Sequence, residues 1–300
     1  RILNTTLPET DAIFSGVSTD TRTLQPGEAF FALSGDHFDG NRFVADALAK
    51  GAALAVTKTP VAGGPCVIVS DPLAALQRFA AHHRACHKIP VIAITGSCGK
   101  TTSKDLIAAV LGTRYRVLKT LGNLNNDIGC PLSLLRLDAE TQCAVIEMGA
   151  NHMGEIASLC EIARPTESAV TMVAPAHLEG FGSIERVAEA KGEIAKGLSP
   201  DGCFYVNTDN PWCVRIGEQF SGKKVLFGSQ GDVVLRSRHR DESGDTIVEV
   251  DPVGVLRLPL SVPAHVTNVL LAIAVGLQHD IREFEVPLRE SVRGTARFKA

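Results

Sequence analysis

The chain has 300 residues, of which 45% are hydrophobic and 21% are charged, with a formal net charge of -3 at pH 7. These values are typical of a globular protein long enough for about two domains. A weakly acidic chain is a poor match for nucleic acid or an anionic membrane surface, and we expect neither as its partner.

Residues 1–86 alternate short strand and helix patterns. Apolar runs predict strands at residues 29–33, 53–56 and 67–69. Between them, Arg42 to Lys50 predicts a helix that ends at Gly51. A second helix is predicted from Pro72 to about Arg84, and the polar pair His87-Lys88 before Pro90 indicates a domain boundary. We expect a small N-terminal α/β domain over residues 1–86.

Residues 87–300 show strands and helices at regular spacing. The predicted strands are residues 91–94, 144–146, 168–173, 203–206 and 224–227. Residues 231–260 alternate apolar and polar positions between turn residues, which predicts a β meander, and a helix is predicted over 264–277. That helix contains the longest apolar run, Val269 to Leu277, which is too short to span a bilayer. We expect a P-loop-type central domain with a mostly parallel sheet flanked by helices.

A glycine-rich turn joins the strand at 91–94 to a helix that ends at Gly112. Its residues are Thr95, Gly96, Ser97, Cys98, Gly99, Lys100, Thr101 and Thr102. Glycines let backbone N–H groups converge on phosphate oxygens, Lys100 can reach the β and γ phosphates, and the Thr101 hydroxyl can bind Mg²⁺. Ile94 stands where the common pattern has its first glycine, so this is a shortened variant of a nucleotide-binding loop.

Two polar residues follow predicted strands, where ligands bind in open α/β sheets. Glu147 comes directly after residues 144–146 and is placed to hold Mg²⁺, although a strand-end carboxylate can also be an ordinary solvated residue. His177 follows the strand at 168–173, and a lone loop histidine is more often a surface residue than a ligand.

Lys191 lies within an apolar stripe at helical spacing that includes Val187, Ala188 and Ile194. A lysine that faces a core is unusual, because burial of an ammonium without a partner is costly. Either its side chain extends along the stripe to solvent or pairs with Glu147 or Glu179, or its neutral amine reacts with CO₂ to form a carbamate that binds metal.

Eight cysteines are spread along the chain without a CxxC pair, and one of them lies in the phosphate loop. This pattern is typical of reduced thiols in the cytosol and not of a disulfide or zinc framework. We expect a cytoplasmic protein.

The order of five motifs resembles the ATP-dependent Mur ligases, a bacterial family. The motifs are residues 95–102, 122–132, 147–151, 176–182 and 190–194. The GNLNN stretch at 122–126 and the EMGANH stretch at 147–152 are similar to the branch of the family that adds D-alanyl-D-alanine. Residues 18–22 and 35–41 are similar to the family's amino-terminal domain, which holds the UDP end of the substrate.

The resemblance implies an ADP-forming carbon–nitrogen ligase of peptidoglycan precursor synthesis, expected as a monomer. ATP would phosphorylate the terminal carboxylate of UDP-N-acetylmuramoyl-tripeptide, and the amine of D-alanyl-D-alanine would attack the acyl phosphate. The implied catalytic residues are Lys100, Glu147, His177 and Lys191. Thr101 and Glu147 would hold one Mg²⁺, and His177 with carbamylated Lys191 a second. The implied ATP-binding residues outside the loop are His265 and Asn268, and the implied substrate-binding residues are Ser18, Thr19, Arg22, Asn123 and Asn126.

The sequence departs from the family in three places. Cys98 replaces a more usual Asn or Ser, Met172 stands where Asn is common, and the Gly-Arg that opens the family's third domain is blurred within residues 293–297. The chain starts at Arg1 and stops at Ala300, so we expect a fragment that lacks the family's C-terminal Rossmann-like domain. We expect this fragment alone to form no peptide bond.

Alternatives remain. They are another Mur-type amino-acid ligase, a small-molecule kinase, a regulatory GTPase and a catalytically inactive nucleotide-binding fragment. A kinase gives no reason for the UDP-side motifs. A GTPase needs an Asn-Lys-x-Asp stretch, and the nearest match, residues 207–210, lacks the lysine.

Overall fold

The computed structural model describes residues 13–35, 38–61, 64–175, 178–260, 262 and 265–297. Its contacts divide the chain into a first unit, residues 1–87 and 127–137, and a second unit, residues 88–126 and 138–300. The domain boundary between residues 86 and 87 that we expect from the sequence stays a prediction. The segment 127–137 lies within the predicted central domain in sequence, yet its contacts are those of the first unit.

The first unit is built on a parallel sheet with the strand order β1-β2-β5-β6. These strands are Val17–Ser18 (β1), Ala29–Phe31 (β2), Leu54–Thr57 (β5) and Cys66–Ile68 (β6). A separate antiparallel ladder consists of Ser34–Gly35 (β3) and Phe38–Asp39 (β4). The helical elements are Gly40–Phe43 (η1), Val44–Ala49 (α1), Pro72–Ala85 (α2) and Gly129–Leu134 (α4). The small α/β domain predicted from the sequence is confirmed.

Helix α2 explains why the segment 127–137 belongs to the first unit. The helix begins at Pro72, and the Asp71 carboxylate accepts hydrogen bonds from the first backbone N–H groups. Its buried residue Leu76 and its neighbour Phe79 share an apolar cluster with Ile128, Leu132 and Leu135 of the segment. Burial of this apolar surface holds α4 against α2.

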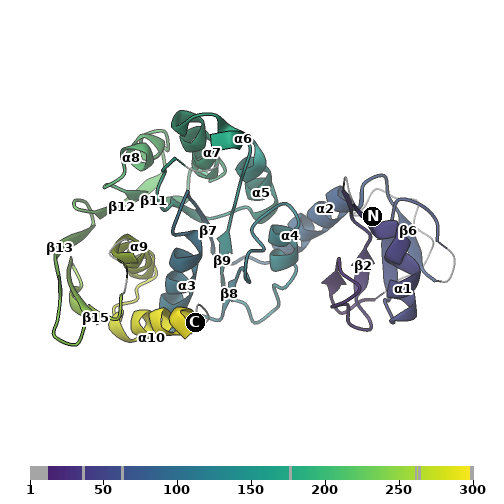
Figure 1. The fold of residues 1–300 in the computed structure, drawn as a ribbon, viewed down its shortest axis with the longest axis horizontal. Coiled ribbons are helices and arrows are strands. Elements are labelled where there is room, and N and C mark those ends of the chain that lie inside the picture. Colours follow the sequence, from purple (N-terminus) through teal and green to yellow (C-terminus); the bar gives the residue numbers. More distant parts are fainter. Residues whose placement is uncertain are drawn as a thin grey trace. The chain divides into compact units, whose positions relative to one another are not determined.

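The second unit contains one sheet with the strand order β15-β14-β13-β12-β11-β10-β7-β9-β8 (Figure 1). The strands from β8 to β13 pair in parallel, and β14 and β15 add antiparallel pairs at one edge. The strands are Val91–Thr95 (β7), Val117–Lys119 (β8), Cys143–Glu147 (β9), Glu167–Val170 (β10), Cys203–Asn207 (β11), Lys223–Gly228 (β12), Val233–Arg240 (β13), Thr246–Asp251 (β14) and Gly254–Leu258 (β15). The mostly parallel sheet and the meander predicted for residues 231–260 are confirmed.

Helices cover both faces of this sheet (Figure 1). On one face lie Lys100–Leu111 (α3), His265–Gln278 (α9) and Glu285–Arg297 (α10), and on the other lie Glu155–Ala163 (α5), Ile184–Lys196 (α7) and Pro211–Glu218 (α8). The short helix α6 (Leu178–Phe181) contacts α7. Alternate strand residues such as Ile92 and Val145 join the core under α3 and α9, as the two-residue repeat of a strand requires.

Strand β10 ends at Val170, whereas the sequence predicts a strand to Val173. The reason lies in the residues that follow, because they bond to the loop after the neighbouring strand β7. The Ser97 backbone N–H donates to the Met172 carbonyl, and the Thr171 hydroxyl donates to the Cys98 carbonyl. The carboxyl ends of β10, β7 and β9 are adjacent in the sheet, so the loops after them share one edge.

Candidate nucleotide and metal site

The loop between β7 and α3 requires glycine at two positions. Gly96 has φ 145° and Gly99 has φ 85°, a region that residues with a side chain rarely adopt. A Cβ on Gly96 would lie 2.0 Å from the Thr171 hydroxyl oxygen, and a Cβ on Gly99 would lie 2.6 Å from Asn268 Oδ1. The loop therefore keeps its backbone N–H groups at the start of a helix, which is the geometry that binds phosphate.

Lys100 opens α3, and its Nζ donates a hydrogen bond to the Gly96 carbonyl at 2.8 Å. The ammonium thus lies over the loop from which it comes. Thr101 is exposed and Thr102 is half-buried, so the Thr101 hydroxyl is open to a ligand. Thr95 is buried, and its hydroxyl oxygen has no hydrogen-bond partner within the described residues.

Asn268 on α9 packs against the loop. Its Oδ1 accepts a hydrogen bond of 3.1 Å from the Ser103 hydroxyl on α3, and both residues are buried. His265 is half-buried in the first turn of the same helix. The structure therefore brings α9 to the phosphate loop, while the adenine contacts expected of His265 and Asn268 stay predictions.

Glu147 ends β9 and is only 2% exposed, so its interpretation as an ordinary solvated residue is wrong. Its backbone N–H donates to the Thr120 hydroxyl, and its Oε1 accepts a 2.9 Å hydrogen bond from Asn125 Nδ2. Its Oε2 is buried without a hydrogen-bond partner, with Lys104 Nζ 3.8 Å away. A carboxylate fixed through one oxygen while the other stays free is suited to bind a cation.

Lys104 and Asn125 are two residues of the site that the sequence analysis missed. Lys104 lies on the α3 face that buries Ile107 and Leu111, so the signal that identified Lys191, a lysine within an apolar stripe, was present here too. Asn125 carries no such signal. It belongs to the GNLNN stretch, and it also accepts a backbone hydrogen bond from Gly149.

Lys191 on α7 is 2% exposed, so its side chain does not extend to solvent. Its Nζ donates to the Ala150 carbonyl at 3.1 Å and lies 5.5 Å from the centre of the Phe181 ring. Within the described residues it has no carboxylate within ion-pair distance, so the alternative that it pairs with Glu147 is wrong. The Glu179 side chain lies outside those residues, so pairing with Glu179 stays untested. Burial, and next the charge of Lys100, lower the pKa of Lys191 to about 8.

His177 lies outside the described residues, so its role as a metal ligand stays a prediction. Over the part of the chain that is described, no group of three or more His, Cys, Asp or Glu residues could hold a metal ion. The oxygen ligands expected from Thr101 and Glu147, with a phosphate, suit Mg²⁺ better than such a cluster would. The structure thus groups the phosphate loop, Glu147 and Lys191 around the adjacent ends of β7 and β9.

The predicted substrate-binding residues fall in two places. In the second unit Asn123 and Asn126 are exposed in the loop after β8. In the first unit the Ser18 hydroxyl donates to the Asp20 carbonyl, and Thr19 is half-buried. Arg22 is exposed, and its side-chain hydrogen bonds hold the pKa of the Asp20 carboxyl at about 2. Their contacts with substrate stay predictions.

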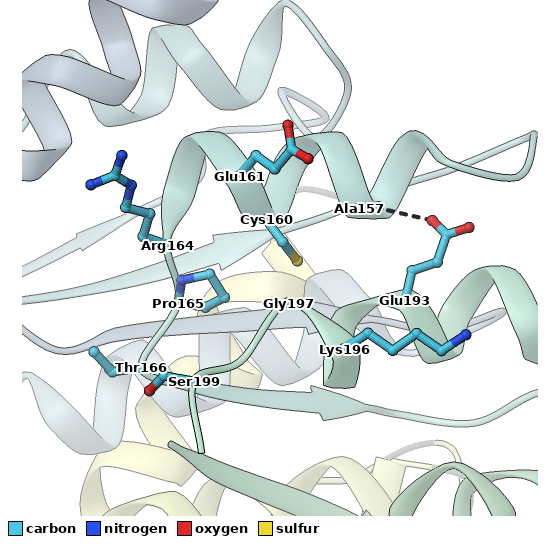
Figure 2. A pocket seen from close by; sticks show the side chains of 10 residues that line it. All are labelled: Ala157, Cys160, Glu161, Arg164, Pro165, Thr166, Glu193, Lys196, Gly197 and Ser199. Carbon is cyan, nitrogen blue, oxygen red and sulfur yellow. Dashed lines mark hydrogen bonds between the residues drawn. The ribbon is translucent and has the colours of Figure 1, made fainter. Parts of the chain in front are cut away.

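A cavity of about 710 Å³ lies between α5 and α7, near the amino ends of the strands and away from the phosphate loop (Figure 2). Its lining includes Thr166, directly before β10, so it is separated from the phosphate loop by the length of the strands. Glu193 also lines it and accepts hydrogen bonds from the backbone N–H groups of Gly154 and Ala157 at the start of α5. The cavity is no part of the nucleotide site.

Comparison with known proteins gives two family models. One, described as the Mur ligase middle domain, matches residues 94–276, and the other, described as Mur ligase family, catalytic domain, matches residues 13–84. The chain is 40% identical over 283 residues to the UDP-N-acetylmuramoyl-tripeptide--D-alanyl-D-alanine ligase of Escherichia coli (strain K12), covering 92% of this chain and 63% of that protein. The ligase of the same name from Bacillus subtilis (strain 168) is 37% identical over 268 residues, covering 88% and 58%.

Solved structures give the same result. MurF from Acinetobacter baumannii has a TM-score of 0.87 at 33% identity, covering 94% of this chain and 63% of that chain. A MurF ligase from Thermotoga maritima in complex with ADP has a TM-score of 0.83 at 28% identity, covering 93% and 66%. The chain therefore spans less than two thirds of the length of these proteins.

Proposed function

We propose that this chain, which belongs to the Mur ligase family, provides the nucleotide-binding and UDP-substrate-binding parts of a UDP-N-acetylmuramoyl-tripeptide--D-alanyl-D-alanine ligase. The identity to curated ligases of that name, together with the match to the middle-domain model over more than half of the chain, supports the assignment. The structural observation that carries it is the free oxygen of the buried Glu147 carboxylate, one strand away from the phosphate loop.

In the proposed reaction the γ-phosphoryl group of ATP moves to the terminal carboxylate of the UDP-muropeptide, and ADP leaves. The amine of D-alanyl-D-alanine then attacks the acyl phosphate, forms the peptide bond and releases phosphate. No protein nucleophile is needed, so the chain has to position the substrates and neutralise charge. The loop N–H groups and the Lys100 ammonium bind the phosphates, while Asn123 and Asn126 face the substrate side.

The residues of the site fit Mg²⁺. Thr101 and Glu147 would hold one ion, which supplies neutralisation of the phosphate oxygens when bound. Asn125 fixes the Glu147 carboxylate so that its Oε2 stays available, and this is the positioning that a metal ligand requires. His177 and a carbamate on Lys191 would hold a second ion.

The surroundings of Lys191 favour the carbamate. The amine is buried beside a carbonyl and an aromatic ring, with a pKa of about 8, so roughly a tenth of it is neutral at pH 7. The neutral nitrogen attacks CO₂, the new N–C bond forms, and one proton leaves to solvent.

The carbamate is tested by substitution of Lys191. Lys191→Ala should lose activity and regain part of it with small carboxylates. An intact-mass shift of one CO₂ that appears with bicarbonate in the wild type, and not in Lys191→Ala, would support it. No such shift at high bicarbonate would contradict it.

We further propose a monomeric enzyme of the bacterial cytoplasm. All eight cysteines are free thiols, which is consistent with a reducing compartment. As a separate finding, none of the helices in the described ranges is long and apolar enough to cross a bilayer.

The test is ADP release by the natural full-length protein, supplied with ATP, UDP-N-acetylmuramoyl-tripeptide and D-alanyl-D-alanine, with each substrate omitted in turn. We expect ADP and the UDP-pentapeptide in equal amounts, and only with all three present. Turnover with a single amino acid in place of the dipeptide would favour another Mur-type amino-acid ligase. Nucleotide binding without any turnover would favour a catalytically inactive protein and overturn the proposal.

A further inference from the structure

Charged side chains of alternating sign lead inward from the surface of the second unit to Glu147. Lys119 Nζ lies 2.7 Å from Asp105 Oδ1, and Lys104 Nζ lies 3.8 Å from the same oxygen. Lys104 Nζ is also 3.8 Å from Glu147 Oε2. Side-chain exposure falls from 41% at Lys119 to 18% at Asp105 and 3% at both Lys104 and Glu147. The last pair is therefore shielded from water.

Lys104 lies at equal distance from two carboxylates and within hydrogen-bond distance of neither. The Glu147 Oε2 atom correspondingly has no hydrogen-bond partner in the described part of the chain. The ammonium thus neutralises the carboxylate without using its lone pairs. A lysine suits this role because its charge is compact and its stem is flexible, whereas an arginine would bind both carboxylate oxygens in a fixed geometry.

We propose that Lys104 is the counter-ion of Glu147 in the metal-free protein and a positioning residue that moves toward Asp105 when Mg²⁺ binds. Among the described residues, Lys104 supplies the one cation within ion-pair distance of the Glu147 carboxylate, so its removal would leave this buried charge unpaired before the nucleotide arrives. When Mg²⁺ is bound, the Lys104 ammonium at its present position repels the doubly charged ion. Asp105 offers the ammonium an alternative partner on the same helix. The inference rests on the proposed role of Glu147 as a metal ligand and not on which amino acid is ligated.

The test measures the coupling between Mg²⁺ and nucleotide. Calorimetry gives the dissociation constant of ADP in EDTA and in saturating Mg²⁺. The coupling factor is the constant in EDTA divided by the constant in Mg²⁺, so a larger factor means that Mg²⁺ strengthens ADP binding more. In Lys104→Met, which keeps the length of the side chain, we expect the factor to rise roughly tenfold, within the usual range for coupled sites. In Lys104→Arg, which keeps the charge but holds Glu147 in a fixed ion pair, we expect it to fall about threefold. A general electrostatic effect of Lys104 would leave the arginine variant unchanged.

Asp105→Asn gives a second measurement that does not depend on a change at Lys104. Loss of the alternative partner should keep Lys104 on Glu147 and lower the factor. Lys196→Met, which removes one charge at the end of α7 beside the cavity, is the matched control and should not change the coupling factor. An unchanged or lower factor in a folded Lys104→Met protein would overturn the inference, as would an unchanged factor in Asp105→Asn. If Glu147 is not a metal ligand at all, Glu147→Gln would have the same coupling factor as the wild type, so failure of the metal site is recognised separately.

Discussion

The imidazole of His279 hydrogen-bonds to the buried carboxylate of Glu167, with Nε2 2.9 Å from Oε1. Glu167 begins β10 and His279 directly follows α9, so this bond ties the far end of the helix to the central sheet. The other oxygen of Glu167 accepts from the Tyr205 hydroxyl. Burial, and next the Glu167 charge, place the pKa of that phenol well above its ordinary value. Helix α9 is thus fixed at one end by Glu167 and meets the phosphate loop at the other through Asn268.

We predict that Glu167→Ala lowers the free energy of unfolding by about 2 to 3 kcal/mol, because it leaves the buried Tyr205 hydroxyl and the partly buried His279 imidazole without their partner. Urea denaturation measures the change, and His239→Ala on an exposed strand position is the control. A loss no larger than that of the control would show that the three side chains contribute nothing jointly.

Lys100→Ala should remove ATP turnover and leave the fold intact. Within the described residues the ammonium bonds only to a carbonyl of its own loop, so its removal should change the free energy of unfolding by no more than about 0.5 kcal/mol. ADP affinity should fall, because phosphate charge is no longer neutralised. The measurements are calorimetric ADP binding and urea denaturation, and an unchanged rate at saturating substrates would refute the phosphate-loop assignment.

Gly99→Ala should weaken ADP binding and lower the free energy of unfolding by about 1 to 2 kcal/mol, since its φ is 85° and the new methyl group would displace Asn268 from Ser103. The matched control is Gly294→Ala inside α10, where the added Cβ meets no described atom within 4 Å. That change should stabilise the protein by about 0.5 to 1 kcal/mol. Equal effects of the two substitutions would show that the loop conformation is not what requires glycine.

Lys191 should make stability depend on pH. Its pKa falls from 10.5 to about 8 on folding, so between these values the unfolded chain binds a proton that the folded chain lacks, and stability rises with pH. Below about pH 8 the folded protein carries the full free-energy cost of burying the Lys191 ammonium. In buffers free of CO₂, Lys191→Met should therefore be more stable than the wild type by up to about 3 kcal/mol at pH 7, and the difference should shrink by pH 9.5.

Urea denaturation at the two pH values measures this difference. The exposed Lys196→Met is the control and should show none. A Lys191→Met advantage that is the same at both pH values would contradict the depressed pKa.

The phosphate loop, both strands beside it and the buried position of Lys191 could be predicted because each has a local pattern. The loop joins a strand to a helix, and Lys191 interrupts an apolar stripe. The Asn125 bond to Glu147 could not be predicted, because it joins the loop after β8 to the end of β9, and their proximity depends on strand order, which the sequence does not display. The end of β10 was misplaced for a similar reason, since Thr171 leaves the sheet to bond with a loop that is distant in sequence. Helix α10 was missed because its apolar positions are sparse and its partners lie on α3 and β15.

The return of residues 127–137 to the first unit makes the covalent path between the two units threefold. The backbone crosses at 87/88, at 126/127 and again at 137/138. One cut in the first connection would leave the halves joined, and a polypeptide beginning at residue 88 would carry the apolar face of α4 without α2 to cover it. The second crossing directly follows Asn126, so the chain passes from one unit to the other one residue after the Asn125 side chain that bonds to the Glu147 carboxylate.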